Sequence, residues 1–242
     1  MRLALIADIH GNLSALDAVL AALQQERLDT IICLGDVAAS GPYPREVLHR
    51  LRDLTFPVVM GNADAELLAP GAMPDESEDE RKIKEISRWA ADQLDAADRG
   101  FIASFRPSVE IDLGPGTRLL CCHGSPRNFN DAILAGTADD DLAAMFVGIG
   151  GQIVASGHTH IRMLRSWRDK ELVNPGSVGL AYQFKADGAV RVPPWAEFAI
   201  LAWHDGVTSV DFRRVAYDQD ATVRAMTERG MPHATWWSAD WG

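Results

Sequence analysis

The sequence predicts an α/β fold, because short apolar runs typical of strands alternate with longer segments of helical periodicity. Residues 3–7 form the first apolar run, and apolar side chains then recur at helical spacing within residues 14–26. Further strands are expected at residues 30–34 and 57–60, with a helix at residues 44–53 between them. This alternation of strand-like and helical periods assigns the fold class.

The pattern changes after residue 68. Residues 69–80 are rich in proline, glycine and acidic side chains and are expected to form an exposed loop. Helices follow at residues 82–94 and 97–105, so we expect the segment 69–108 to be a small helical insertion that caps a site. The remaining expected elements are a helix at 139–146 and strands at 109–113, 118–122, 152–156, 162–167, 171–173, 198–203 and 207–215, the last two joined by the hairpin signal His204-Asp205-Gly206.

The size and charge of the chain narrow the classes of function. Its 242 residues fit one domain, residues 1–242, better than two. There are 23 Lys and Arg against 34 Asp and Glu, so the formal net charge is −11. Most of such a surface repels nucleic-acid backbones and anionic membranes, and we expect no bulk nucleic-acid binding and no membrane partner. A phosphate-bearing substrate would need a strong local positive charge, which metal ions can supply.

The apolar segments and the cysteines favour a cytoplasmic location. No run of about 18 apolar residues occurs, and residues 1–7 are too short for a signal-peptide core. Cys33, Cys121 and Cys122 are an odd number and lie in apolar segments, which suits reduced thiols better than a disulfide framework.

Polar side chains directly follow five of the expected strands. In chain order they are Asp8 with His10, Asp36, Asn62, His123, and His158 with His160. Ligands of α/β sheets bind beyond the carboxyl ends of the strands, where loops converge. The sequence therefore predicts that two Asp, one Asn and four His meet in one region, as a ligand set suited to two divalent metals.

The chemistry of a two-metal site explains these residue types. Carboxylates supply the negative charge that keeps two cations about 3.5–4 Å apart, and one carboxylate must bridge them to offset their repulsion. Imidazoles favour first-row transition metals over Mg²⁺. A neutral Asn amide leaves net positive charge for a phosphate group.

Five short motifs resemble, in order, those of the calcineurin-like metallophosphoesterases: Asp8-Ile9-His10, Gly35-Asp36, Gly61-Asn62, His123-Gly124 and Gly157-His158-Thr159-His160. The stretch Asn174-Pro175-Gly176-Ser177-Val178-Gly179 further resembles the small bacterial and archaeal phosphodiesterase branch of that superfamily. The resemblance extends over about three quarters of the chain.

The resemblance implies an α+β four-layer sandwich, in which two mixed β-sheets pack face to face and are flanked by helices. It implies that Asp8, His10, Asp36 and His160 hold one metal and that Asp36, Asn62, His123 and His158 hold the other, with Asp36 bridging. A hydroxide that bridges the metals would attack phosphorus, so Asp36, Asn62 and His123 would act in catalysis through it. The expected cofactors are two divalent ions, Mn²⁺ first, with Fe, Zn²⁺ and Ni²⁺ as alternatives because they accept similar ligands.

One position departs from the pattern of the family. Many members have His after the Asn of the third motif, where it assists the leaving group or binds phosphate, but here the stretch is Gly61-Asn62-Ala63-Asp64. Ala63 has no proton to give, and a missing general acid costs about 10²–10⁴-fold where the leaving group needs protonation. The sequence therefore favours phosphodiesters over alkyl monoesters.

Several loop residues are weaker candidates for substrate contact. Asn12 and Tyr43 lie in the loops after the first two strands and could touch substrate, but helix capping and packing are the favoured explanations. Arg127 and Asn128 lie just past His123 and could bind phosphate. The tail at residues 232–242 contains three tryptophans, which favours packing on the domain or a surface for an oligomer or partner.

The function predicted from the sequence is metal-dependent hydrolysis of a small phosphorylated substrate, with phosphodiesters preferred. A phosphomonoesterase or nucleotide-polyphosphate hydrolase stays open, because metal ligands do not define the leaving group. The alternative from another class is a non-catalytic metal-binding scaffold protein, and a homo-oligomer is compatible with either.

Overall fold

In the computed structural model, which describes residues 1–71, 76–150 and 152–242, the first of two main sheets has four strands. Its order is β11 (Val207–Ala216), β10 (Trp195–His204), β1 (Arg2–Ile6) and β2 (Thr30–Cys33). β1 pairs with β2 in parallel and with β10 antiparallel, so the sheet is mixed. The parallel pair directs the carboxyl ends of β1 and β2 to the same edge.

The second main sheet has five strands and is also mixed. Its order is β3 (Val109–Gly114), β4 (Thr117–Cys121), β5 (Ile153–Ala155), β7 (Lys170–Asn174) and β6 (Met163–Trp167). The central strands β4, β5 and β7 are parallel, and the two edge strands are antiparallel to their neighbours. A separate hairpin joins β8 (Gln183–Phe184) and β9 (Val190–Arg191).

The two sheets pack face to face because their strands carry apolar side chains on the two faces that meet. Leu3 and Leu5 belong to the core between the sheets, together with Leu119 of β4 and Ile153 of β5. Ala4 and Ile6 point to the other side of β1, into a core shared with helices. β1 is therefore buried on both faces, which explains why it is apolar at every position after Arg2.

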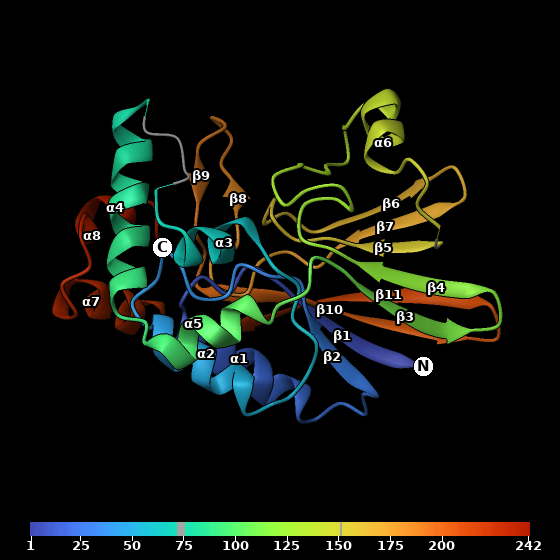
Figure 1. Cartoon of the computed structure of the whole chain (residues 1–242), viewed down its shortest axis with the longest axis horizontal. Coiled ribbons are helices and arrows are strands. Elements are labelled where there is room, and N and C mark those ends of the chain that lie inside the picture. The colour runs from blue at the N-terminus through green and yellow to red at the C-terminus, as the bar shows by residue number, and fades with distance from the viewer. Residues whose placement is uncertain (72–75, 151) are drawn as a thin grey trace.

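Helices cover the outer face of each sheet and complete four layers (Figure 1). α1 (Leu13–Leu23), α2 (Pro44–Arg52) and α5 (Ala96–Ala103) contribute to the core beneath the first sheet. α6 (Asp139–Met145) packs on the second sheet through Leu142 and Met145. The α/β sandwich expected from the sequence is thus confirmed.

The remaining helices form one side of the molecule. α4 (Glu78–Asp92) stands beside α7 (Gln219–Glu228) and α8 (Ala234–Trp237), as Figure 1 shows, and these helices share a small apolar cluster around Ile86, Met226 and Met231. The tryptophans of the tail pack against this cluster. None of the helices in the described ranges combines the length and the apolar character needed to span a bilayer.

Three local expectations are wrong. Residues 57–60 do not form a strand, because Val58 and Val59 make only isolated bridges, to Cys33 and Arg106. Asn62 does not follow a strand but begins a short helix, α3 (Asn62–Leu68). The expected loop 69–80 ends early, since α4 begins at Glu78 with Ser77 as a cap that accepts from the amide of Glu80. Residues 72–75 of that loop lie outside the described residues.

Candidate metal centre

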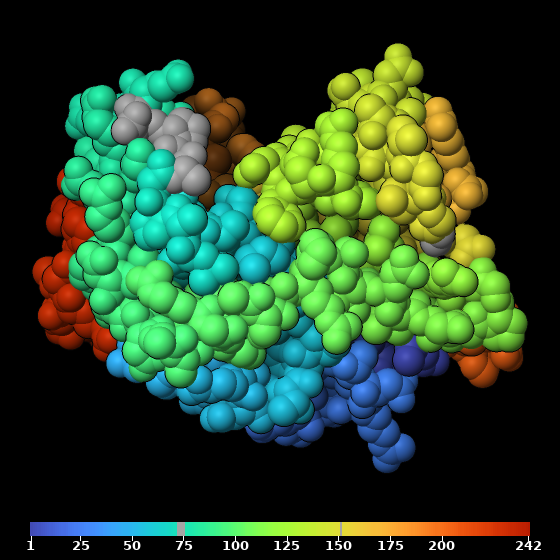
Figure 2. Space-filling view, in the orientation of Figure 1, coloured from blue at the N-terminus to red at the C-terminus, as the bar shows by residue number. Residues whose placement is uncertain are grey.

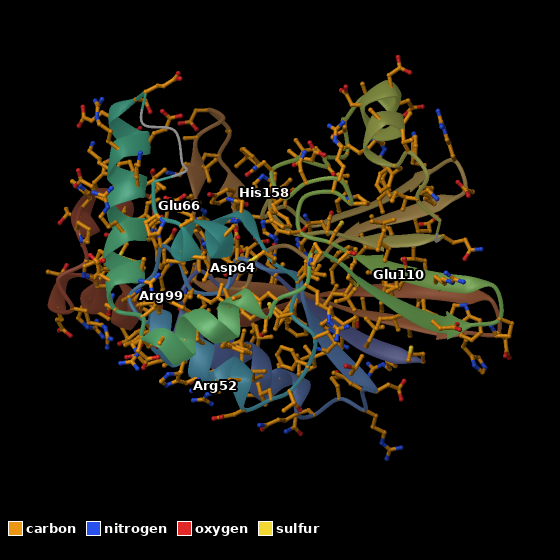
Figure 3. All side chains as sticks on the ribbon, viewed as in Figure 1. Arg52, Asp64, Glu66, Arg99, Glu110 and His158 are labelled. Atoms are coloured by element: carbon orange, nitrogen blue, oxygen red, sulfur yellow. The ribbon has the colours of Figure 1, made fainter. Side chains whose placement is uncertain are left out.

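The seven side chains predicted to bind metal come from five separate segments that the fold brings together. Asp8 and His10 lie in the loop after β1, Asp36 after β2, Asn62 at the start of α3, His123 after β4, and His158 and His160 after β5. Figure 3 labels His158, which lies near the middle of the molecule, where the loops from both sheets meet. The placement follows from the topology, because these strands end at one edge of the sandwich.

Six of these residues form two groups of potential ligands. Asp8, His10 and His160 form one group, and Asp36, His123 and His158 form the other. Within each group the ligand atoms lie within 4.8 Å of one another, and all the members are buried except the half-buried His158. The first group is the first ligand set that the resemblance implies, without Asp36. The second group is the second set, without Asn62.

Asp36 connects the two groups. Its Oδ2 lies 3.3 Å from Nε2 of His123 and 3.8 Å from Nε2 of His10. Its Oδ1 accepts a hydrogen bond from the amide of Ala63 at 2.8 Å, which fixes the direction of the carboxylate. Oδ1 of Asn62 lies 3.0 Å from Nε2 of His123 and therefore joins the second group.

Backbone carbonyls orient the imidazoles so that lone pairs converge. Nδ1 of His160 donates to the carbonyl of Leu180 at 2.8 Å, so Nε2 of a neutral ring carries the lone pair, and this Nε2 lies 3.1 Å from Nε2 of His10. Nδ1 of His123 donates in the same way to the carbonyl of Leu34, at 2.8 Å. Imidazole nitrogens and carboxylate oxygens that converge in a buried site are the atoms that bind divalent metals, so the residues present fit one such ion at each group.

Charge in this cluster shifts the pKa values in opposite directions. Burial lowers the pKa of His123, but the charge and hydrogen bond of Asp36 outweigh burial and raise it to about 10. Burial and the neighbouring His160 lower the pKa of His10 to about 4. Burial would raise the pKa of Asp36, but His123 and then His10 hold it well below its usual range. In the metal-free protein, a proton on His123 therefore offsets the charge of Asp36.

Asp64, which the sequence analysis did not single out, holds two ligand loops together. Its carboxylate is fully buried and accepts from the amides of Asp36 and Val37, both at 2.8 Å, and of Gly61 at 3.1 Å. These bonds tie the loop after β2 to the start of α3 (Figure 3). The sequence signal was its position two residues after Asn62 in a motif already suspected of binding metal.

The backbone at the ligands is unusual. Five of the seven candidate ligands have positive φ values between 49° and 68°: Asp8, His10, Asp36, His158 and His160. Non-glycine residues in this region cost about 1–3 kcal/mol each and persist only where the surroundings enforce them. At Gly61 a side chain is excluded outright, because a Cβ atom would lie 2.1 Å from Oδ1 of Asp36.

Hydrogen bonds from the Asn174–Gly179 motif hold the backbone of two of the loops that carry ligands. The hydroxyl of Ser177 donates to the carbonyl of Asp8 at 2.7 Å, and the amide of Gly179 donates to the same carbonyl at 3.0 Å. Nδ2 of Asn174 donates to the carbonyl of Gly157 at 2.7 Å. The motif therefore positions the loops that carry Asp8 and His158.

Comparison with known proteins agrees with the site. Residues 1–192 match the family model described as the calcineurin-like phosphoesterase superfamily domain. The chain belongs to the calcineurin-like phosphoesterase superfamily. Members of this superfamily bind divalent metals, and the matched residues contain all seven candidate ligands. Membership supports metal-dependent hydrolysis of phosphoesters as the activity.

Individual relatives span most of the chain. The uncharacterized protein MJ0912 of Methanocaldococcus jannaschii is 29% identical over 196 residues, which cover 73% of this chain and 76% of that protein. The crystal structure of a metallophosphoesterase from Sphaerobacter thermophilus is 28% identical, with a TM-score of 0.74 over 99% of this chain and 98% of that one. The hypothetical protein PH1004 from Pyrococcus horikoshii OT3 shares the fold, with a TM-score of 0.81, 21% identity and coverage of 98% and 96%.

A pocket of about 160 Å³ opens over the ligands of this superfamily member. Besides ligands, its walls include Ala63, Ser40, two residues of α4, Tyr182 and Trp237. The ring of Tyr182 lies 4.6 Å from the ring of His160, between centroids. Ile83 and Ser87 of α4 line the pocket. Among these wall residues, Ala63 stood out in the sequence, and the tryptophan-rich tail was expected to pack on the domain or form an oligomer or partner surface, whereas nothing singled out Ser40, Ile83, Ser87 or Tyr182.

The four weaker candidates for substrate contact all make contacts within the protein. Asn12 caps α1 by accepting from the amide of Ala15 and donates to the carbonyl of Gly179. The guanidinium carbon of Arg229 lies over the ring of Tyr43, 4.7 Å from the centroid of that ring. Within the loop after His123, Arg127 pairs with Asp131 at 2.6 Å, and the side chain of Asn128 accepts from the amides of Asn130 and Asp131. None of the four is among the described residues that line the pocket over the ligands.

The position of Asp64 predicts a metal-binding defect in Asp64→Asn. An amide has one acceptor oxygen, whereas the carboxylate of Asp64 uses both of its oxygens to accept three backbone amides. Because partners that orient metal ligands typically contribute 10–100-fold to affinity, we expect Mn²⁺ to bind roughly that much more weakly, measured by calorimetry on folded protein. Asp92→Asn, at an exposed position, is the matched control, and unchanged affinity of Asp64→Asn would contradict this role.

The raised pKa of His123 predicts that metal binding releases a proton. A metal at Nε2 must displace the proton held there, so protons compete with metal and the apparent affinity falls as pH falls. We expect the Mn²⁺ affinity to rise about tenfold per pH unit between about pH 6 and 8 for one released proton. Calorimetry in buffers of different ionisation enthalpy counts the protons, and His204→Gln, at an exposed hairpin, should leave the count unchanged. A pH-independent affinity would refute this protonation state.

Proposed function

We propose that this protein is a dinuclear metal-dependent phosphoesterase that prefers phosphodiesters among small substrates. One observation carries the proposal: the Oδ2 atom of Asp36 lies between two groups of buried ligands, 3.3 Å from His123 on one side and 3.8 Å from His10 on the other. A carboxylate in this position suits the bridge that two adjacent cations require.

The ligand sets follow from the two groups. Asp8, His10, Asp36 and His160 would hold one ion, and Asp36, Asn62, His123 and His158 would hold the other, with Mn²⁺ as the first candidate. Two such ions would lower the pKa of water to about 7 and stabilise the charge that develops on a phosphoryl group.

The residues of the chain fix the geometry of this site. The carbonyls of Leu34 and Leu180 hold His123 and His160 with their Nε2 atoms turned toward the ligand groups. The amide of Ala63 holds Asp36, and the amide of His158 donates to Asp8 at 3.1 Å. Such fixed ligands need no reorganisation when charge develops on the substrate.

Ala63 supports the preference for diesters. Its methyl group lines the pocket over the ligands, at the position where the family motif that the sequence resembles has His, and it cannot protonate a leaving group. Esters whose leaving group departs as a stable anion need no such proton. A diester with one good leaving group is therefore a better substrate than an alkyl monoester.

Metal removal and an Asp36 variant test the function together. Protein stripped by a chelator should not hydrolyse bis(p-nitrophenyl) phosphate, and Mn²⁺ should restore turnover. Asp36→Asn removes charge from the proposed bridge and should lower kcat/KM by more than about a hundredfold, whereas the exposed Asp92→Asn should not. Full turnover by stripped protein would exclude the proposal, and metal binding without any turnover would favour the non-catalytic scaffold.

The missing donor predicts a gain from Ala63→His. An imidazole at this wall of the pocket can protonate a poor leaving group, so hydrolysis of methyl phosphate should rise by about tenfold or more, toward the 10²–10⁴-fold typical of general acids. Hydrolysis of p-nitrophenyl esters should change far less. Ala63→Gln, which adds bulk without a titrating group, is the control. Equal gains on both ester types would argue against a role in protonation.

A further inference from the structure

A second pocket, of about 370 Å³, adjoins the pocket over the ligands, and we call it the tryptophan pocket. Its lining includes Leu180, Tyr182, Val192, Trp236, Trp237 and Trp241. Leu180, Tyr182 and Trp237 line both pockets, so the two share a boundary. In Figure 2 the surface is hollowed between the part of the molecule that carries α4 and the β8–β9 hairpin and the part that carries α6.

The aromatic side chains of this pocket are held in place by α4. The rings of Trp236 and Trp237 lie 5.9 Å apart between centroids, and Nζ of Lys82 lies 4.8 Å from the centroid of Trp236. Nε2 of His233, at the start of α8, lies 2.8 Å from a carboxylate oxygen of Glu85. Fixed indole rings offer flat apolar faces that stack on planar groups at little cost in conformational entropy.

Charge selects what enters this pocket. Asp79 and Asp240 line it, and no lysine or arginine of the described residues does. Lys82 pairs with Asp79 at 3.6 Å and Lys185 with Asp240 at 3.9 Å, so these carboxylates are balanced and leave no unpaired lining charge to attract a second phosphate group. An uncharged ring needs no such charge. The volume of the tryptophan pocket lies in the range of pockets that bind small organic molecules.

We infer that the tryptophan pocket binds an uncharged planar ring, aryl or nucleobase, that belongs to the substrate whose phosphate group lies at the metal centre. This inference rests on the proposed function and adds the class of substrate to it. Tyr182 lies at the boundary between the two pockets, because its ring lies beside His160 on one side and lines the tryptophan pocket on the other. A nucleoside or aryl phosphoester with a single phosphate group fits both pockets, whereas a polyphosphate chain would find no lysine or arginine among the described lining residues of the tryptophan pocket.

Binding of two phosphonates to the Mn²⁺-loaded protein tests the inference without turnover. Phenylphosphonate and methylphosphonate carry the same head group, and only the first has a ring. We expect the dissociation constant of phenylphosphonate to be lower by about tenfold, the scale of stacking on aromatic side chains. Calorimetry measures both constants on wild-type protein, Trp237→Leu and Trp203→Leu. Trp203 lies on β10, outside both pockets, and makes the second substitution a matched control.

The outcomes separate this inference from the proposed function. A preference for the ring that falls below about threefold in Trp237→Leu and persists in Trp203→Leu supports the pocket. Equal constants in wild-type protein, or a preference that Trp237→Leu leaves intact, overturn it, and so does the absence of binding by either phosphonate. A preference for the ring in protein that hydrolyses no phosphoester would overturn the proposed function alone. Turnover of diesters without any such preference would overturn the tryptophan pocket alone.

Discussion

Buried negative charge is the constraint on which the centre of this molecule depends. The carboxylates of Asp8, Asp36 and Asp64 are at most 2% exposed; Asp8 and Asp36 lie in the loops after β1 and β2, and Asp64 lies in the first turn of α3. Burial and the charge of Asp36 raise the pKa of Asp64, whereas three backbone amides favour its charged form. Carboxylates so placed need positive charge nearby, because an unpaired buried charge is strongly unfavourable. A proton on His123 meets part of that need in the metal-free protein, and divalent ions would meet it more fully.

The same constraint accounts for the strained backbone around the ligands. Sharp turns after β1, β2 and β5 direct carboxylates and imidazoles inward from strands whose own side chains fill the two cores. Each turn is enforced by hydrogen bonds from another segment, such as Ser177 and Gly179 on the carbonyl of Asp8. The unfavourable φ values therefore persist because rigid neighbours fix these loops, and a rigid ligand set is what a preorganised centre requires.

The sequence predicted what depends on local pattern. Asp8, Asp36, His123 and His158 could be found because each follows an apolar run that the chain must bury as a strand. Features that depend on pairing between segments distant in the sequence could not be predicted. The segment 57–60 looks like a strand, but only single bridges form on either side of it, and the short α3 has too few residues for a periodic signal. Nothing local distinguishes Tyr182, which faces His160 only after the second sheet has formed.

The tryptophans beside the site and its candidate metal ligands come from different parts of the chain. All seven candidate ligands lie within residues 1–192, which match the superfamily, whereas Trp236, Trp237 and Trp241 lie beyond them. The tail reaches the pocket because Met226 and Met231 pack with Ile86 of α4 in one apolar cluster, which holds α7 and α8 against that helix. The candidate metal ligands and the tryptophans of the second pocket are therefore supplied by separate segments, although Leu180, Tyr182 and Val192, which also line that pocket, lie within the matched residues. Because α4 carries Ile83 and Ser87 on the wall over the ligands and also supports the tryptophans, a change in its packing would alter both pockets together.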